Sequence, residues 1–322
     1  MLVLVAPGQG SQAPGFLTPW LELPGAADRL RAWSDLVGLD LVHYGTEADA
    51  EEIRDTAVAQ PLLVAGALLS AAALFGDGVD GAEEVAARRA AVGVTAGHSV
   101  GELAAAALAG VFSADDAMRL VRRRGLAMAE AAAVTDTGMS AVLGGDPEEV
   151  AGILEKLGLT AANDNGGGQI VAAGTTEQLA ALAAAKPDRA RVRPLQVAGA
   201  FHTHHMAPAV AAMNEAVAGV EVADPGMRYV SNADGGLVAD GGQILRRLVD
   251  QVSSPVRWDL CMETFRRLGV TGFVELCPGG TLAGLARRNL PDVRRVALKT
   301  PDNLTAAREL IAEHSADEAT KA

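Results

Sequence analysis

The sequence predicts an α/β fold with a mainly parallel sheet and an inserted ferredoxin-like small domain. Short apolar runs at 2–6, 90–96 and 273–276 end at glycine or proline, as buried strands do, and helix-forming segments follow them. The middle of the chain instead follows the order β-α-β-β-α-β. The boundaries we expect are 1–132 and 199–313 for the large domain, 133–198 for the small domain, and 314–322 for a polar, disordered tail.

Composition restricts the possible functions. The chain has 322 residues, 49% of them hydrophobic and 21% charged, so it can fold around a full-sized core. Aromatic residues make up only 3%, and 27 Lys and Arg against 40 Asp and Glu give a net charge of −13. Few rings for base stacking, and a charge that repels phosphate, argue against a nucleic-acid partner.

Neither the cysteines nor the apolar segments indicate secretion or membrane insertion. Cys261 and Cys277 are too few for a disulfide framework and have no zinc-ligand spacing to histidine. The N-terminus lacks the basic segment of a signal peptide. The longest apolar stretch, 62–75, is shorter than the roughly 20 residues that cross a bilayer. We expect a buried helix there, in a cytoplasmic protein without a membrane partner.

The N-terminal part alternates strands with helices. A glycine-rich turn, GQGSQ, follows the strand at 2–6. A loop, GDGVDG, separates the apolar helix from the strand at 90–96, and small residues at 101–109 form the next helix. Ser113, with Asp116 three positions later, has the spacing of an N-terminal cap and begins another helix.

The inserted unit has its own capping signals. Asp146 and Pro147 begin a helix that runs to about residue 157, and Thr175 with Gln178 forms a capping box for a second helix. The four strands around these helices are expected at 139–143, 159–162, 169–173 and 191–197. The turn between the middle two strands is NDNGGG.

After the insert the chain is mainly helical. Helices are expected at 207–218, 242–251 and 256–268. Pro278-Gly279-Gly280 follows the strand at 273–276 and begins a further helix. Strands and helices therefore alternate on both sides of the insert, as in a mainly parallel sheet.

The strongest chemical signal is Gly97-His98-Ser99-Val100-Gly101, which fits the pattern G-x-S-x-G. This pattern places a serine on a sharp turn between a strand and a helix, and the glycines avoid Cβ clashes. The free N–H groups of the helix can face a developing oxyanion. An apolar strand before the turn and a helix after it favour Ser99 as a nucleophile over an ordinary glycine-flanked turn.

A serine nucleophile needs a base, and the histidines of FHTHHM are the best candidates. The same cluster could be a solvated turn, whereas a metal site is disfavoured because no Cys or carboxylate lies nearby in sequence. An α/β-hydrolase triad runs serine, acid and late histidine, and here no acid before the cluster is an obvious partner. We therefore expect a Ser–His dyad oriented by a neutral oxygen.

The helix predicted after the Ser113 cap carries an arginine on its apolar face. The apolar stripe consists of Ala117, Leu120, Val121 and Met128. Arg124 lies inside this stripe, seven residues after Ala117. A core-facing arginine must be paired. It is either a structural ion pair or carbonyl ligand, or it binds a substrate carboxylate through two parallel hydrogen bonds.

The turn GQGSQ lacks the third glycine of the dinucleotide pattern G-x-G-x-x-G, so we reject a Rossmann interpretation. In an α/β sheet this turn and the serine turn both lie at the carboxyl ends of strands, where ligands bind. The glycine-rich turn could therefore supply a second backbone N–H to the oxyanion.

Taken together, GQGSQ, GHSVGE, RRRGLAM, NDNGGGQIVAAG, GAFHTHHM and QVSSPVRW resemble, in order, the malonyl-CoA:acyl carrier protein transacylases. The resemblance covers about residues 1–300. It implies an α/β-hydrolase-like large domain with a ferredoxin-like insert. It also implies transfer of a malonyl group from malonyl-CoA to the phosphopantetheine thiol of an acyl carrier protein, through a malonyl-serine and without a metal or redox cofactor.

The resemblance also assigns roles. Ser99 would carry the malonyl ester, and His202 would act as base and then acid, oriented by the main-chain carbonyl of Gln251. The backbone N–H groups of Gln12 and Val100 would form the oxyanion hole. The residues implied in substrate binding are Arg124 on the malonate carboxylate, Met128 in the acyl pocket, Phe201, His98 and Asn163.

In the related acyltransferase domains of polyketide synthases, the residue before the catalytic histidine selects the acyl group. Malonyl-type domains have Phe there and methylmalonyl-type domains usually have Ser, so Phe201 and Val100 resemble the malonyl type. The ring would fill the space of an α-methyl group, a discrimination of about 1–3 kcal/mol. The chain departs from the family at Ser254, where Asn is common, and at Gly166-Gly167, where Ser-Pro is common.

Carrier proteins are typically acidic, as this chain is, so docking needs a local basic patch on a monomer. The candidate residues are Arg287, Arg288, Arg294, Arg295, Lys186, Arg189 and Arg191. Three alternatives remain open. They are a trans-acting acyltransferase of a polyketide synthase, a serine thioesterase or hydrolase, and a non-enzymatic carrier-binding module in which Ser99 lies in a structural turn.

Overall fold

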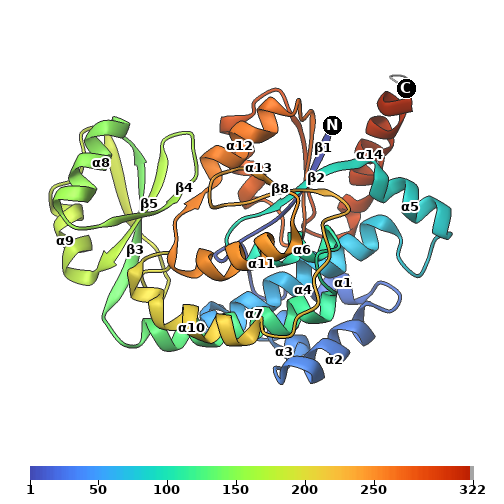
Figure 1. Cartoon of the computed structure of the whole chain (residues 1–322), viewed down its shortest axis with the longest axis horizontal. Coiled ribbons are helices and arrows are strands. Elements are labelled where there is room, and N and C mark those ends of the chain that lie inside the picture. The colour runs from blue at the N-terminus through green and yellow to red at the C-terminus, as the bar shows by residue number, and fades with distance from the viewer. Residues whose placement is uncertain (320–322) are drawn as a thin grey trace.

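The structure is a computed structural model that describes residues 1–319, and these residues form two sheets. Six strands form the larger sheet in the order β11-β10-β1-β2-β7-β8, and five form the smaller one in the order β6-β3-β5-β4-β9. In the larger sheet only β7 and β8 pair antiparallel. Figure 1 shows the smaller sheet, in yellow-green, at one end of the molecule. The predicted α/β fold with a mainly parallel sheet is confirmed.

The larger sheet is built around the predicted buried strands. β1 (Leu2–Ala6) is buried at every residue and pairs in parallel with β2 (Val92–Gly97) on one side and β10 (Gly272–Glu275) on the other. The outer strands, which were not predicted from the sequence, are β7 (Arg228–Val230), β8 (Leu237–Val238) and β11 (Arg294–Ala297). They are short and partly exposed, so no apolar run marks them.

The long core helix, α4 (Thr56–Phe75), begins before the predicted residue 62 and contains Pro61. Proline cannot donate to the carbonyl four residues earlier, and here that carbonyl, Ala57 O, accepts a hydrogen bond from Arg122 Nη1 at 2.8 Å. At 20 residues and a mean hydropathy of 1.9, α4 is the one described helix long and apolar enough to cross a membrane. However, 89% of its apolar window is buried inside the fold.

The predicted caps begin helices where expected. Ser113 Oγ accepts a hydrogen bond from Asp116 N at 3.0 Å at the start of α7 (Ala114–Ala132). Asp146 caps α8 (Pro147–Lys156), and the capping box of Thr175 and Gln178 begins α9 (Thr176–Ala184). The other predicted helices correspond to α6 (Gly101–Leu108), α10 (Ala207–Ala216), α11 (Gly241–Asp250) and α13 (Thr281–Asn289).

Several helices were not predicted. The α-helices among them are α1 (Thr18–Leu21), α2 (Ala26–Val37), α3 (Leu41–Thr46) and α5 (Ala82–Ala90). The described residues also form short 3-10 helices: η1 (Glu52–Arg54), η2 (His204–Met206), η3 (Gln251–Ser253) and η4 (Pro301–Asn303). None of the residues of α5 is buried, so this helix has no apolar stripe that a sequence pattern could reveal.

The smaller sheet packs with α8 and α9 around a separate hydrophobic core, which includes Val142, Leu154 and Leu182. Its first four strands are β3 (Thr137–Gly144), β4 (Thr160–Asp164), β5 (Gln169–Thr175) and β6 (Ala190–Pro194). Neighbours among these four pair antiparallel, and with α8 and α9 they follow the order β-α-β-β-α-β. β6 ends at Pro194 rather than at the predicted residue 197.

The fifth strand of this sheet comes from a distant part of the chain. β9 (Val256–Arg257) lies parallel to β4, pairing Val256 with Asn163. The helix predicted for 256–268 therefore begins only at Trp258, as α12 (Trp258–Arg267).

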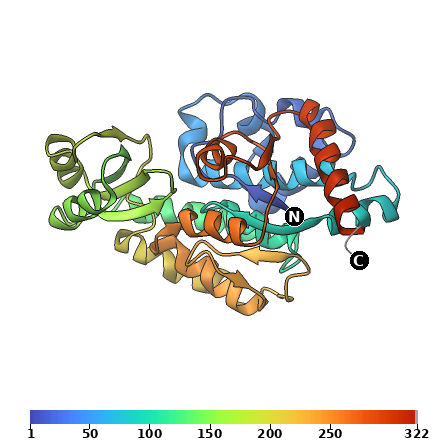
Figure 2. The same cartoon turned by 90° about the horizontal axis from the view of Figure 1, so that it is seen from above.

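The predicted disordered tail is a helix as far as the structure describes it. α14 (Leu304–Ala319) continues through His314, which is buried with Nε2 2.9 Å from Thr271 Oγ1 and Nδ1 2.8 Å from Leu310 O. Figures 1 and 2 both show α14, in red, beside α5. Residues 320–322 of the predicted tail lie outside the described residues.

Candidate active site

The turn after β2 exposes Ser99 at the start of α6. Ser99 has a φ of 53°, in the left-handed region that L-residues rarely adopt. A Cβ on Gly97 would lie 2.0 Å from the backbone carbon of Gly101, and a Cβ on Gly101 would lie 2.3 Å from Ala6 O. Only glycine fits at either position, which explains why the G-x-S-x-G pattern predicted this turn.

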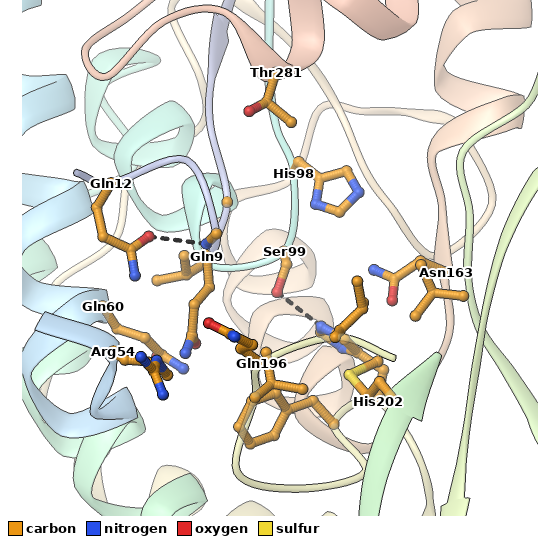
Figure 3. Close-up of a pocket in the computed structure, with 18 of the residues that line it drawn as sticks. Gln9, Gln12, Arg54, Gln60, His98, Ser99, Asn163, Gln196, His202 and Thr281 are labelled. Atoms are coloured by element: carbon orange, nitrogen blue, oxygen red, sulfur yellow. Dashed lines mark hydrogen bonds between the residues drawn. The ribbon is translucent and has the colours of Figure 1, made fainter. Parts of the chain in front are cut away.

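His202 is the partner of Ser99. Its Nε2 lies 2.7 Å from Ser99 Oγ, and its Nδ1 lies 2.8 Å from the main-chain oxygen of Gln251 (Figure 3 shows the first of these contacts). A carbonyl only accepts, so Nδ1 carries the proton and Nε2 accepts from the serine hydroxyl. Burial and the Arg124 cation lower the pKa of His202 to about 3, so the imidazole is neutral at pH 7.

Arg124 is buried next to this pair, with only 1% of its surface exposed. Its Nη1 donates to Gln60 Oε1 at 2.7 Å, and its Nη2 donates to Gln251 Oε1 at 2.9 Å and to Ser99 Oγ at 3.4 Å. Burial lowers the pKa of Arg124 to about 10, so it remains charged at pH 7. Among the described residues, no carboxylate lies within ion-pair distance of it. A buried cation held only by neutral oxygens is suited to receiving an anion.

A cavity of about 500 Å³ opens at Ser99 and His202. All the other predicted oxyanion and substrate residues except Arg124 line it: Gln12, Val100, Met128, Phe201, His98 and Asn163. In Figure 3, Gln12, Gln60 and Arg54 lie on one side of Ser99 and Asn163 on the other. Within the described part of the chain, Arg54 is the one Lys, Arg, Asp or Glu that lines this cavity.

The predicted oxyanion donors are the backbone N–H groups of Gln12 and Val100. The side chain of Gln12 holds its own turn, accepting from Gly10 N at 2.8 Å and donating to Ile53 O at 3.1 Å. Among the residues that the structure describes, none accepts a hydrogen bond from the backbone N–H of Gln12 or of Val100. Both N–H groups are therefore available to a ligand in the cavity.

The predicted substrate residues are anchored by neighbours. Met128 Sδ accepts a hydrogen bond from Gln60 Nε2 at 3.4 Å, and Phe201 is buried. His98 Nε2 lies 2.9 Å from Asn165 Oδ1, and burial lowers the pKa of His98. Within residues 1–319, no group of three His, Cys, Asp or Glu side chains is placed to hold a metal ion.

Four polar residues that support the serine turn were not predicted from the sequence: Gln60, Glu102, Tyr229 and Asn232. Asn232 Oδ1 accepts from Ser99 N and its Nδ2 donates to Gly97 O, both at 2.8 Å. Gln60 stands out in the sequence as a polar residue in an apolar run. Glu102 directly follows the G-x-S-x-G pattern, but an acid in the first turn of a helix is ordinary. Nothing local marks Tyr229 or Asn232.

Only some of the predicted basic residues are free to meet a partner. Arg287 and Arg288 are exposed on the last turn of α13, whose residues Thr281 and Leu285 line the cavity. Arg288 Nη2 also donates to Gln169 Oε1 at 2.7 Å, so it is held by a neutral side chain but by no carboxylate among the described residues. Arg294 is paired with Glu313. Arg295 donates to the main-chain carbonyls of Leu290, Pro291 and Val293. Lys186, Arg189 and Arg191 are exposed on the smaller sheet and its loops, and Arg189 is paired with Asp188.

Comparison with known proteins agrees with this geometry. The profile of the acyl transferase domain matches residues 3–301. The malonyl CoA-acyl carrier protein transacylase of Mycobacterium tuberculosis is 51% identical over 307 residues, 94% of this chain and 98% of that protein. The crystal structure of MCAT from Mycobacterium tuberculosis matches with a TM-score of 0.89 at 50% identity, over 96% of this chain and 99% of that one.

A solved complex is also similar. It contains a type II PKS acyl-carrier protein with its malonyl-transacylase, and it matches with a TM-score of 0.86 at 29% identity, over 96% of this chain and 99% of that chain.

Proposed function

The chain belongs to the acyl transferase domain family, and from this premise we propose that it is a malonyl-CoA:acyl carrier protein transacylase supplying malonyl units for fatty acid synthesis. The observation that carries the proposal is the 2.7 Å contact between Ser99 Oγ and His202 Nε2, beside a buried arginine that has no carboxylate partner among the described residues. The alternative of a structural serine turn does not explain why a neutral base lies against Ser99.

In the first half-reaction, Ser99 Oγ attacks the thioester carbonyl of malonyl-CoA while its proton moves to His202 Nε2. The carbonyl of Gln251 keeps the proton on Nδ1 and so holds the ring in the accepting tautomer. The N–H groups of Gln12 and Val100 donate to the oxyanion. The C–S bond then breaks, His202 returns the proton to the CoA thiolate, and the malonyl ester remains on Ser99.

In the second half-reaction, the phosphopantetheine thiol of the carrier protein attacks the ester carbonyl. His202 takes the thiol proton and gives it to Ser99 Oγ as the ester bond breaks. The base is oriented by a neutral carbonyl rather than by an acid, so the imidazolium receives less stabilisation than in a triad.

Arg124 binds the free carboxylate of the malonyl group. Its Nη2 lies 3.4 Å from Ser99 Oγ, so a carboxylate two carbons beyond the ester is within its reach. An acetyl group would leave the buried cation without an anion, and the site would disfavour it for that reason. Phe201 lines the same cavity and fills the space that an α-methyl group would need.

The CoA phosphates and the acidic carrier protein both need positive charge to bind, although this protein as a whole is acidic. Arg54, in the cavity wall, faces the phosphates of CoA, and Arg287 and Arg288 bind the acidic carrier protein beside the same opening. In support, a similar protein has been solved in complex with a carrier protein.

We further propose two domains. The small domain, 133–198, is ferredoxin-like, in agreement with antiparallel strands in the order β6-β3-β5-β4. The large domain, 1–132 and 199–313, is α/β-hydrolase-like, and α14 extends it to Ala319. The enzyme acts as a cytoplasmic monomer, and both of its cysteines are unpaired and buried.

The test is the intact mass of the protein after brief mixing with malonyl-CoA, with Ser99→Ala in parallel. We expect a malonyl adduct on the unchanged protein alone, discharged by holo-carrier protein and long-lived in water. An adduct lost rapidly to water would favour a hydrolase, and no adduct on the folded protein would remove Ser99 as nucleophile. Faster discharge to a polyketide carrier than to a fatty acid carrier would favour the trans-acting polyketide role.

A further inference from the structure

Glu102 is a buried carboxylate with no role in the mechanism above. It lies in the first turn of α6 with 1% of its surface exposed. Its Oε1 accepts hydrogen bonds from Tyr229 Oη at 2.9 Å and from Asn232 N at 2.8 Å, and its Oε2 accepts from Gln251 Nε2. Burying a carboxylate is costly, and three donors aimed at its two oxygens show a site built for an acceptor.

The partner that matters is the side-chain amide of Gln251, whose two ends have different neighbours. Nε2 donates to Glu102 and to Ser99 O at 3.1 Å, and Oε1 accepts from Arg124 Nη2 at 2.9 Å. If the amide were reversed, its oxygen would face two acceptors and its N–H₂ group would face a guanidinium that can only donate. Glu102 therefore selects the orientation in which Gln251 can hold Arg124.

We propose that Glu102 is a positioning residue for this reaction: it fixes the amide of Gln251, which in turn fixes the Arg124 guanidinium that meets the acyl carboxylate. The inference rests on the proposed malonyl transfer. It adds that Glu102, which does not line the cavity, contributes to the selection of malonyl over acetyl groups through Gln251 and Arg124. Burial raises the pKa of Glu102 to about 7, against the opposing influence of its hydrogen bonds and of Arg124. The carboxylate form that accepts at both oxygens therefore dominates from about pH 8, the pH at which the variants are compared.

Glutamine cannot replace Glu102, although it has the same shape. A carboxylate accepts at both ends, whereas the amide introduced by Glu102→Gln would present its N–H₂ group either to Gln251 Nε2 or to Asn232 N. One donor–donor contact is unavoidable. Rotation of the Gln251 side chain would relieve the contact with its Nε2, but this rotation would break the hydrogen bond from Arg124 to Gln251 Oε1. The main-chain oxygen of Gln251 stays in place, so the orientation of His202 is kept.

The test compares acylation of Ser99 by malonyl-CoA and by acetyl-CoA, as kcat/KM with holo-carrier protein as acceptor. For Glu102→Gln we expect the malonyl-to-acetyl ratio to fall by about tenfold or more, while the acetyl rate changes by less than about threefold. The matched control is Tyr229→Phe, which removes one donor from the same carboxylate but leaves the contact with Gln251. It should keep the ratio within about threefold. Parallel losses for both substrates, an unchanged ratio, or an equal loss in Tyr229→Phe would overturn the inference.

A second variant keeps the inference testable if Glu102→Gln does not fold. Glu102→Asp keeps a carboxylate but shortens the side chain by one methylene, so it cannot accept from Tyr229 and Asn232 and still reach Gln251 Nε2. We expect the malonyl-to-acetyl ratio to fall by about threefold or more, while the acetyl rate changes by less than about threefold. An unchanged ratio in folded Glu102→Asp contradicts the inference.

The two hypotheses fail separately. If the unchanged protein forms no malonyl adduct, the proposed function fails. If it is malonylated but Glu102→Gln keeps the full malonyl-to-acetyl ratio, only the role of Glu102 fails.

Discussion

Gln251 fixes two chemical groups at once. Its main-chain oxygen accepts from His202 Nδ1, and its side-chain oxygen accepts from Arg124 Nη2. The proposed base and the cation proposed to bind the acyl carboxylate are thus held by a single residue. Substitutions at Gln251 and at Arg124 should therefore have non-additive effects, because residues in one hydrogen-bond network couple.

Arg124→Ala should erode the preference for malonyl over acetyl. Losing one partner of a buried, hydrogen-bonded charge pair costs about 2–5 kcal/mol, so the ratio of kcat/KM values should fall by roughly 100-fold. The measurement is acyl transfer from each CoA ester to holo-carrier protein. Arg123→Ala is the matched control, since Arg123 is only half-buried on the neighbouring position of the same helix. An unchanged ratio in a folded Arg124→Ala protein would remove the assigned role.

The low pKa of His202 predicts the pH dependence of the base. The proposed reaction needs the neutral imidazole, and a pKa of about 3 keeps His202 neutral well below pH 6. We expect kcat/KM for acetyl-CoA to change little from about pH 7 to about pH 5, whereas an ordinary histidine would cost roughly 30-fold over that range. Acetyl-CoA is the right substrate because Glu102, with a pKa of about 7, also titrates in this range. Through Gln251 and Arg124 that titration is proposed to affect only a substrate with a free carboxylate, which acetyl-CoA lacks.

The control is circular dichroism at each pH, which should show a folded protein throughout. An acid limb near pH 6.5 would contradict the neutral, buried state of His202.

At the residue scale, the sequence was informative where the chemistry is local. Ser99 lies in a five-residue pattern, and Arg124 lies on an apolar stripe, so both were predicted and the structure brings them within 3.4 Å. Glu102 and Asn232 act through contacts with residues more than 100 positions away. A single sequence does not encode which distant donor a buried carboxylate will meet.

At the scale of elements, the strand–turn–helix around Ser99 depends on close approach between backbones. β1, β2 and α6 meet where Gly97 and Gly101 face Ala6 and each other, at distances that leave no room for a methyl group. The strained backbone of Ser99 is held in this way, and its N–H is bound to Asn232.

Gly97→Ala should therefore destabilise the protein by roughly 3 kcal/mol, at the upper end of the usual cost of overpacking, because the clash is with backbone. Gly152→Ala is the contrasting variant. Gly152 lies exposed in α8 with no atom within 4 Å of the position that a methyl group would take, so the change should stabilise the protein by about 0.5–1 kcal/mol. Urea unfolding measures both. Equal stabilities would show that the close approach at Gly97 relaxes freely.

Elements with local signals were predicted well, and elements defined by tertiary contacts were not. The caps at Ser113, Asp146 and Thr175 begin helices as expected. The start of α4 was placed too late, because the bond from Arg122 to Ala57 O compensates for Pro61 inside the helix. β9 is two residues long and exists only through its pairing with β4, so 256–268 was taken for an uninterrupted helix.

At the scale of the whole molecule, electrostatics set a problem for docking. The net charge of −13 opposes an acidic carrier protein at long range. Arg294 is paired with Glu313, and Arg295 is held by three main-chain carbonyls. Arg287 and Arg288 remain as the basic pair on α13 beside the cavity, with Arg288 held only by Gln169 Oε1.

The double charge reversal Arg287→Glu/Arg288→Glu should raise KM for the carrier protein by about tenfold, with KM for malonyl-CoA changed less than twofold. The effect should shrink as salt is added. Arg31→Glu is the control, because Arg31 lies exposed on α2, which contributes no residue to the cavity wall. Equal increases in KM for both substrates would argue against docking on α13.

The two-residue strand β9 also bears on how this protein could be re-engineered. β9 follows the 3-10 helix Gln251–Ser253 and pairs with β4 of the smaller sheet. β4 also places Asn163 in the cavity wall. The segment 133–198 is consequently not an interchangeable cassette. A chimera that imports it from a relative with another acyl preference would need to bring matching residues at 256–257. Otherwise it would lose an edge pairing a few residues from the Gln251 carbonyl that accepts from His202 Nδ1.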